Sequence, residues 1–202
     1  IQFADNITAI YASTGAVATA PVGDYLITAT LNDPDGRLAN YTVTLNTGTL
    51  SVTPRALTVS PADKTKIYGD VFTLFTGTIT GIQNGEAITA TYSSPGAVAT
   101  ATVAGSPYPI TAVLNAPAGV LANYSITLNT GELTVTPRAL SVTPDNKSKL
   151  FGTVFTAFTG TITGIQNGDA ITATYASTGA PAAAPSGSYP ITATANAPAG
   201  VL

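Results

Sequence analysis

The sequence of 202 residues contains no cysteine, methionine, tryptophan or histidine. Without cysteine no disulfide can staple the fold, and thiolate catalysis and thiolate-bound metal sites are excluded. Without histidine the chain also lacks the side chain that most often serves as a general base and as a metal ligand. We therefore expect a protein that is not an enzyme and that needs no cofactor.

Charged residues are almost as scarce. They make up 8% of the chain, the formal net charge is −3, and the few lysines and arginines form no cluster. A surface of this kind repels a phosphate backbone, so nucleic acid is not expected as a partner. No apolar run approaches the roughly 18 residues that a membrane-spanning helix needs, so we expect no membrane insertion of this segment.

What the sequence does contain is an internal repeat. The phrase VTPRALTVSPADKTKIYGD, which starts at Val52, returns as VTPRALSVTPDNKSKLFGT at Val135, 83 residues later. Because the pattern is cut at both ends and no initiating methionine or signal peptide is present, we interpret the chain as a piece of a longer polypeptide. The predicted domains are the C-terminal part of a first repeat (1–53), a complete repeat (54–136) and the N-terminal part of a third repeat (137–202).

Within each repeat, apolar and polar residues alternate with a period of two, which is typical of strands with one buried face. Ile88, Ala90 and Tyr92, for example, alternate with threonines. The dipeptide Asn84-Gly85 is typical of a tight hairpin. Together these signals predict about seven short strands per repeat and an all-β fold, a two-sheet antiparallel sandwich.

The repeated Pro-Arg dipeptides, Pro54-Arg55 and Pro137-Arg138, mark a change in this alternation. Leu50 and Val52 are apolar at even positions, whereas the apolar residues after Pro54 stand at odd ones. Side chains alternate strictly along a strand, so one strand cannot bury both sets on the same face. Proline also lacks a backbone donor and restricts its neighbour. We therefore predict that one core ends and the next begins at each Pro-Arg, with practically no linker.

Arg55 and Arg138 stand at these inter-repeat junctions. One interpretation is a clamp, in which the guanidinium donates hydrogen bonds to carbonyl groups or a carboxylate of the neighbouring repeat. The other is a solvated arginine beside a turn. The sequence alone favours neither.

The phrases VTPRALTVSPADKTKIYGD, NGEAITATY and NYSITLNTGELTVTP resemble the MBG repeat of the YGX type, which occurs in tandem in large bacterial surface and secreted proteins, including filamentous adhesins. Tyr68-Gly69 matches the Tyr-Gly element of that family, whereas Phe151-Gly152 departs from it by one hydroxyl. The resemblance implies tandem immunoglobulin-like sandwiches of about 83 residues, with a β-grasp-like repeat as the alternative fold. It also implies an extracellular or cell-surface location and supplies no catalytic residue.

Two further site hypotheses are weaker. Asp33 and Asp35 could be half of a calcium loop, but alanines replace both acids in the equivalent loops, so a plain turn is the better interpretation. An intramolecular isopeptide bond would need a lysine and a buried carboxylate, and only Glu132 stands near a suitable place. The lysines that fall beside predicted turns are Lys64, Lys66, Lys147 and Lys149.

The leading functional hypothesis is a non-catalytic structural repeat that forms a stiff extracellular stalk, fibre or matrix filament. Its expected partners are the neighbouring repeats of the same chain and, in a fibre, further copies of itself. The alternative is an adhesin module that binds a glycan or a cell-surface protein through the loop from Ser93 to Ser106. That loop is two residues longer than its counterparts, and length variation is typical of exposed loops.

Overall fold

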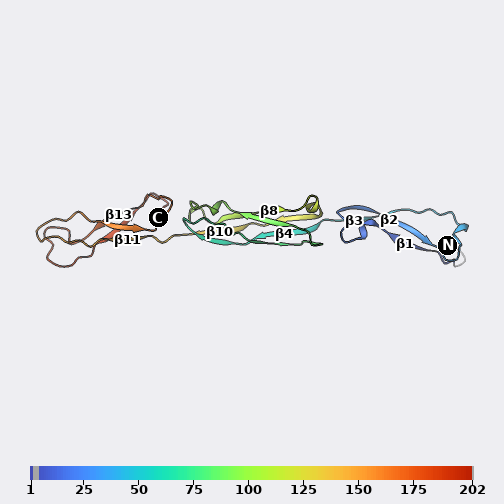
Figure 1. Cartoon of the computed structure of the whole chain (residues 1–202), viewed down its shortest axis with the longest axis horizontal. Helices are drawn as coiled ribbons and strands as arrows, with labels where there is room; N and C mark the ends of the chain where they lie inside the picture. The colour runs from blue at the N-terminus through green and yellow to red at the C-terminus, as the bar shows by residue number, and fades with distance from the viewer. Residues whose placement is uncertain (2–4, 202) are drawn as a thin grey trace. The chain divides into compact units, whose positions relative to one another are not determined.

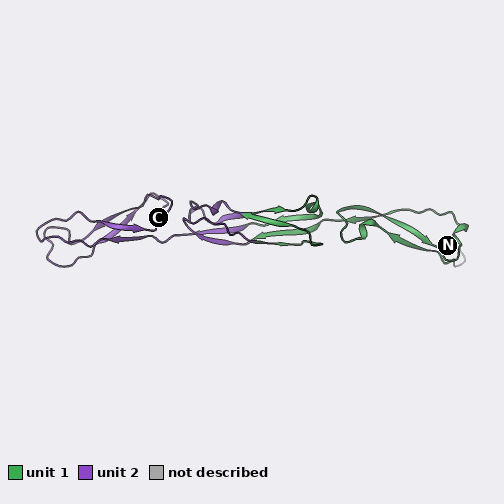
Figure 2. Cartoon of the chain, in the orientation of Figure 1, with its two compact units in different colours: residues 1–61, 77–92, 111–130 green, residues 62–76, 93–110, 131–202 purple. Residues whose placement is uncertain are grey.

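The structure is a computed structural model that describes residue 1 and residues 5–201 (Figure 1). The chain divides into two compact units, one made of residues 1–61, 77–92 and 111–130, the other of residues 62–76, 93–110 and 131–202 (Figure 2). In the described part of the chain there are strands, loops and short 3-10 turns but no α-helix, so the all-β prediction is confirmed.

The first unit contains one antiparallel sheet built from the first repeat alone. Its strand order is β1 (Thr8–Ala12), β2 (Gly23–Asn32) and β3 (Gly48–Val52). Strand β2 alternates between half-buried and exposed residues along all of its length. This is the two-residue period that the sequence predicts.

A second three-stranded sheet of this unit belongs to the complete repeat. Strand β4 (Arg55–Pro61) lies in its centre, antiparallel to β6 (Gly77–Thr80) and parallel to β9 (Tyr124–Leu128). From Leu57 onward, buried and half-buried side chains alternate on β4, with Leu57 and Val59 fully buried.

Strand β7 (Thr89–Ser93) lies beside the second half of β8 (Tyr108–Asn115), which starts in the second unit and ends in the first. The hydroxyl groups of Thr89 and Thr91 donate to backbone carbonyls of β8, at 3.5 Å each. Threonine therefore adds side-chain hydrogen bonds to this strand pair.

In the second unit, β10 (Gly131–Thr136) lies between two strands of the complete repeat. It runs parallel to β5 (Lys64–Ile67) and antiparallel to the start of β8. Leu133 and Val135 of β10 are buried, at 0% and 2% exposure.

The rest of the second unit is the third repeat, which forms two antiparallel pairs. Strand β11 (Ser141–Pro144) pairs with β12 (Gly160–Thr163), and β13 (Thr172–Ala176) pairs with β14 (Thr192–Asn196). By sequence these four strands are the counterparts of β4, β6, β7 and β8.

The complete repeat thus has seven strands, β4 to β10, in a sandwich-like arrangement, as predicted. Most strand pairs are antiparallel, as predicted, but two pairs of the complete repeat, β4–β9 and β5–β10, are parallel, which the sequence did not predict. Side chains alternate with the same period in parallel and antiparallel ladders, so the sequence pattern carries no information on strand direction.

The buried apolar residues of the described chain all lie in the complete repeat. Leu133 is fully buried between β5 and β8, whereas its counterpart Leu50 on β3 is only half-buried. The reason is that, among the described residues, β3 has β2 on one side and no strand paired with its other side. The core residues are Leu57, Val59, Ile88, Ala101, Ile110, Ala112, Tyr124, Leu133 and Val135.

Candidate functional site: the junctions between repeats

At the first junction, only Thr53 and Pro54 separate β3 from β4. Strand β3 pairs with β2, whereas β4 pairs with β6 and β9, so no hydrogen-bonded ladder runs through Pro54. The inward-facing positions change parity here, from Leu50 and Val52 on β3 to Leu57 and Val59 on β4. The chain therefore leaves one sheet and enters another within two residues.

The second junction has the same plan. Strand β10 ends at Thr136, and β11 begins at Ser141 in a different sheet. The start of β11 is later than the equivalent start of β4: the first three residues of β4 pair with β9, whereas in the described part of the third repeat β11 pairs with β12 alone. Pro137 is exposed, as Pro54 is.

Arg138 connects the two repeats at this second junction. Its Nε atom donates to the backbone carbonyl of Tyr68, at 2.7 Å, and its guanidinium forms an ion pair with the carboxylate of Asp70. The Arg138 side chain is 28% exposed and that of Asp70 52%. Of the two interpretations that the sequence allows, the geometry at Arg138 is that of a clamp.

Arg55, at the first junction, is exposed and makes no ion pair with any described residue. Among the described residues, Arg55 and Arg138 thus differ in their contacts although they occupy the same position of the repeat.

A second type of contact occurs at both junctions and involves hairpin asparagines. Asn84 and Asn167 have left-handed backbones, with φ of 54° and 52°. The Asn84 Nδ2 atom donates to the carbonyl of Ala18 at 3.3 Å, and the Asn167 Nδ2 atom donates to that of Ala99 at 3.1 Å. Ala18 and Ala99 occupy the same position of the repeated GAVATA loop. The two junctions thus share one hydrogen bond between hairpin tip and loop.

The Tyr-Gly element lies directly at the second junction. The Tyr68 hydroxyl donates to both carboxylate oxygens of Asp169, at 3.2 and 3.1 Å. A Cβ atom on Gly69 would lie 2.5 Å from Cγ of Gln166, and the φ of Gly69 is +91°. Only glycine fits this close approach.

Sequence reasoning missed these contacts, because it assigned Asn84-Gly85 to a hairpin and nothing more. The repetition of the hairpin and of the GAVATA loop at equivalent positions was the available signal. Which hairpin contacts which loop depends on the fold, so the repetition in the sequence alone could not predict these contacts.

Glu86, the counterpart of Asp169, has a different partner. It accepts a hydrogen bond from the Tyr124 hydroxyl within its own repeat, and this hydrogen bond raises the pKa of Tyr124. The Tyr124 oxygen in turn accepts from the backbone N–H of Gln83, at 2.9 Å. Tyr124 thus holds the base of the hairpin that carries Asn84.

Lys66 is a buried charged residue next to the second junction, 5% exposed. Its Nζ atom donates to the carbonyls of Asp70, at 2.9 Å, and Val98, and burial lowers its pKa. Glu132, the carboxylate considered for an isopeptide bond, is exposed on β10. The structure does not bring the two together, and Lys66 instead holds the Tyr-Gly loop.

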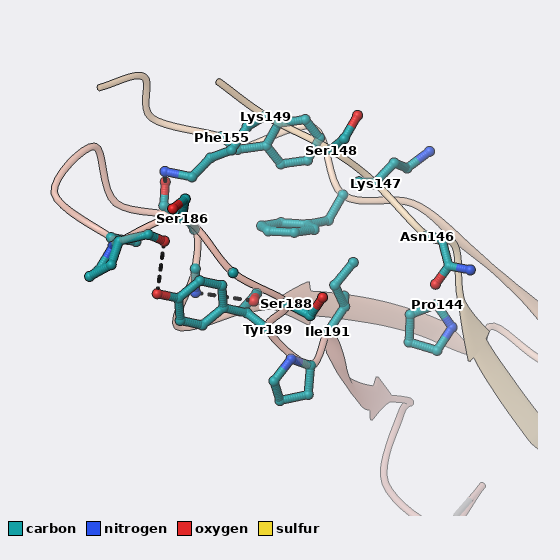
Figure 3. A pocket seen from close by; sticks show the side chains of 18 of the residues that line it. Pro144, Asn146, Lys147, Ser148, Lys149, Phe155, Ser186, Ser188, Tyr189 and Ile191 are labelled. Atoms are coloured by element: carbon teal, nitrogen blue, oxygen red, sulfur yellow. Dashed lines mark hydrogen bonds between the residues drawn. The ribbon is translucent and has the colours of Figure 1, made fainter. Parts of the chain in front are cut away.

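A cavity of about 630 Å³ lies within the third repeat (Figure 3). Lys147 and Lys149 line one side, and Ser188, Tyr189 and Ile191 line the other. Their counterparts in the complete repeat lie on or just before β5 and β8, the two strands that flank β10. The cavity therefore occupies the place that β10 fills in the complete repeat, and we do not assign it to a small ligand.

The acidic turn considered for calcium has a structural explanation. The Asp33 carboxylate accepts the backbone N–H groups of Leu38 and Arg37, at 2.7 and 2.9 Å, and these bonds lower its pKa. Within the described ranges no group of three or more potential metal ligands comes together. Asp33 therefore serves to close its own turn.

The clamp gives a first testable prediction. Replacing Arg138 by alanine removes a hydrogen bond and an ion pair, but both groups are partly exposed, so we expect a loss of about 1 kcal/mol or less in global stability. The local effect is larger: backbone amides of 68–70 should exchange hydrogen faster. Arg55→Ala is the matched control and should change exchange little. Equal effects of the two substitutions on their surroundings would contradict the clamp.

A family model for the MBG domain (YGX type) matches residues 57–134 and 140–199 of the chain. No curated protein and no solved structure matches it. The two matched segments lie in the complete repeat and in the third repeat. Arg55 stands just before the first matched segment, and Arg138 stands between the two.

Proposed function

Because the chain belongs to the MBG domain family of the YGX type, we propose that it is a non-catalytic spacer, a stiff stalk or filament segment of a large bacterial surface or secreted protein. Membership of this family supports a role as a repeat module of large surface proteins. The proposal adds that the module acts by holding consecutive repeats at a fixed join and that it works outside the cell.

The observation that carries this proposal is the direct junction. Two residues separate β3 from β4, and the asparagine-to-loop hydrogen bond recurs at both junctions. A flexible Gly/Ser linker would leave each repeat free to reorient. A two-residue join that carries proline and is bridged by side chains restricts that freedom, which is what a stalk requires.

No helix in residues 5–201 has the length and hydropathy needed to cross a membrane. The centre of the variable loop, considered for ligand binding, is held by the fold, because Lys66 and Asn167 bind the carbonyls of Val98 and Ala99. No specific contact favours an adhesin role of this loop.

Small-angle X-ray scattering tests the proposal. We expect the native chain to give a narrow distribution of interatomic distances that one arrangement of the repeats reproduces. A variant with a Gly-Ser-Gly-Ser insertion after Pro137 is the matched control and should give a broader distribution with a smaller mean span, as a flexible tether does. If native and insertion chains scatter alike, the join is not stiff and the stalk function is wrong.

A further inference from the structure

We propose that the complete repeat is a mechanical clamp: the parallel ladders β4–β9 and β5–β10 make it resist tension applied along the chain. This function goes beyond that of a spacer, since a spacer needs reach and direction but not strength. The inference starts from the two strand pairs whose direction the sequence did not predict.

Tension along the chain enters the complete repeat at Arg55 and leaves it at Thr136, the ends of its first and last strands. In the first unit, β4 is in parallel register with β9, from Arg55 opposite Tyr124 to Val59 opposite Leu128. In the second unit, β5 is in parallel register with β10, up to Thr136 opposite Ile67. The first and last segments of the repeat are therefore paired with each other in both units.

The parallel direction decides how such a ladder is loaded. The chain pulls the first strand by its N-terminal end and the last strand by its C-terminal end, and in a parallel pair these are opposite ends of the ladder. The force then acts along the strands, and all inter-strand hydrogen bonds stretch together. An antiparallel hairpin pulled at its two open ends separates one bond at a time. Each bond is worth only about 1 kcal/mol net, so simultaneous loading determines the strength.

Contacts outside the ladders connect the same two segments. The Asn129 backbone N–H donates to the carbonyl of Val59, and its side chain to Ser60 Oγ, both at 2.9 Å. The Glu132 backbone N–H donates to the Asp63 carboxylate at 2.8 Å. These bonds bridge the two segments where β4 ends and where β10 begins.

Two more contacts close the far end of the second ladder. The Thr136 hydroxyl donates to the backbone carbonyl of Lys66 at 3.1 Å. The backbone carbonyl of Thr136 accepts the backbone N–H of Tyr68 at 2.9 Å. Side chains on both loaded segments are buried, including Leu57, with 0% exposure, and Val135, with 2%. Water therefore has little access to these side chains of β4 and β10, whereas most of β9 is exposed.

The absence of cysteine makes a direct test available, because a pair of introduced cysteines defines the pulling axis. In the full chain, Thr53→Cys with Ala139→Cys loads the complete repeat from end to end, in shear. Thr53→Cys with Ala122→Cys pulls at the same end of the β4–β9 ladder and peels it open. All three positions are exposed. Single-molecule force spectroscopy should give an unfolding force several-fold higher for the shear axis than for the peeling axis.

Thermal unfolding of the two double variants is the control, since equal midpoints show that only the direction of force differs. Ser125→Cys in place of Ala122→Cys repeats the peeling geometry at a second exposed position. Equal unfolding forces along the two axes would overturn the proposal that the complete repeat is a mechanical clamp. The scattering test of the spacer is independent: a stiff chain without directional strength refutes the clamp alone, and a flexible chain with directional strength refutes the spacer alone.

Discussion

Replacing Leu133 by alanine should lower the free energy of unfolding of the complete repeat by about 2–5 kcal/mol. Leu133 is fully buried on β10, between β5 and β8, and pairs with Lys64 on one side and Tyr108 on the other. Removing the side chain takes away its burial and leaves a cavity where strands meet on both sides. Denaturant unfolding followed by hydrogen exchange of the amides in 54–136 would measure and localise the loss.

Leu50→Ala is the matched control, because Leu50 and Leu133 stand at the same position of nearly identical phrases, LNTGTLSVTPRAL and LNTGELTVTPRAL. Both leucines also lie opposite a tyrosine of the neighbouring antiparallel strand, Tyr25 and Tyr108. Leu50 is only half-buried, so its replacement should cost clearly less. Equal losses would show that burial in the complete repeat does not set the stability of this position.

The comparison of these two leucines also shows what the sequence could predict. Alternation and internal repetition indicated the all-β fold, seven strands in the complete repeat, and a change of inward parity at Pro54 and Pro137. All of these depend on neighbours in sequence. The burial of Leu133 depends on β5, whose residues lie far away along the chain, so the nearly identical local phrases around Leu50 and Leu133 cannot predict it.

The junction shows the same division between local and distant information. Proline, the parity change and the absence of a linker are local, so the sequence pointed to Pro54-Arg55 and Pro137-Arg138 as the place where repeats meet. The partners of Arg138 are Tyr68 and Asp70, about 70 residues earlier, and no spacing rule connects them. The parallel pairing on which the mechanical clamp rests also depends on distant residues. Strand direction does not change the two-residue period of the side chains, so the sequence pattern cannot predict it.

Replacing Gly81 by alanine is the second substitution for which we expect a large effect. Gly81 follows β6 with a φ of +104°, and a Cβ atom there would fall against the backbone carbonyl oxygen of Ala56 on β4. The backbone of β4 cannot move away easily, because Ala56 is paired with Ser125 of β9. Gly164 has the same φ class and the same contact with the carbonyl of Ala139, so the requirement recurs in the third repeat.

We expect Gly81→Ala to cost more than about 3 kcal/mol, since a non-glycine residue in such a backbone conformation alone costs about 1–3 kcal/mol and the clash with Ala56 adds to it. Gly85→Ala is the control four residues away: φ is +68° and nothing lies within 4 Å of the added Cβ. There only the left-handed conformation is unfavourable, at about 1–2 kcal/mol. Thermal and denaturant unfolding of the two variants would compare them. A loss at Gly81 no larger than that at Gly85 would mean that β4 yields at Ala56, and a β4 that yields so readily could not be one side of a load-bearing ladder.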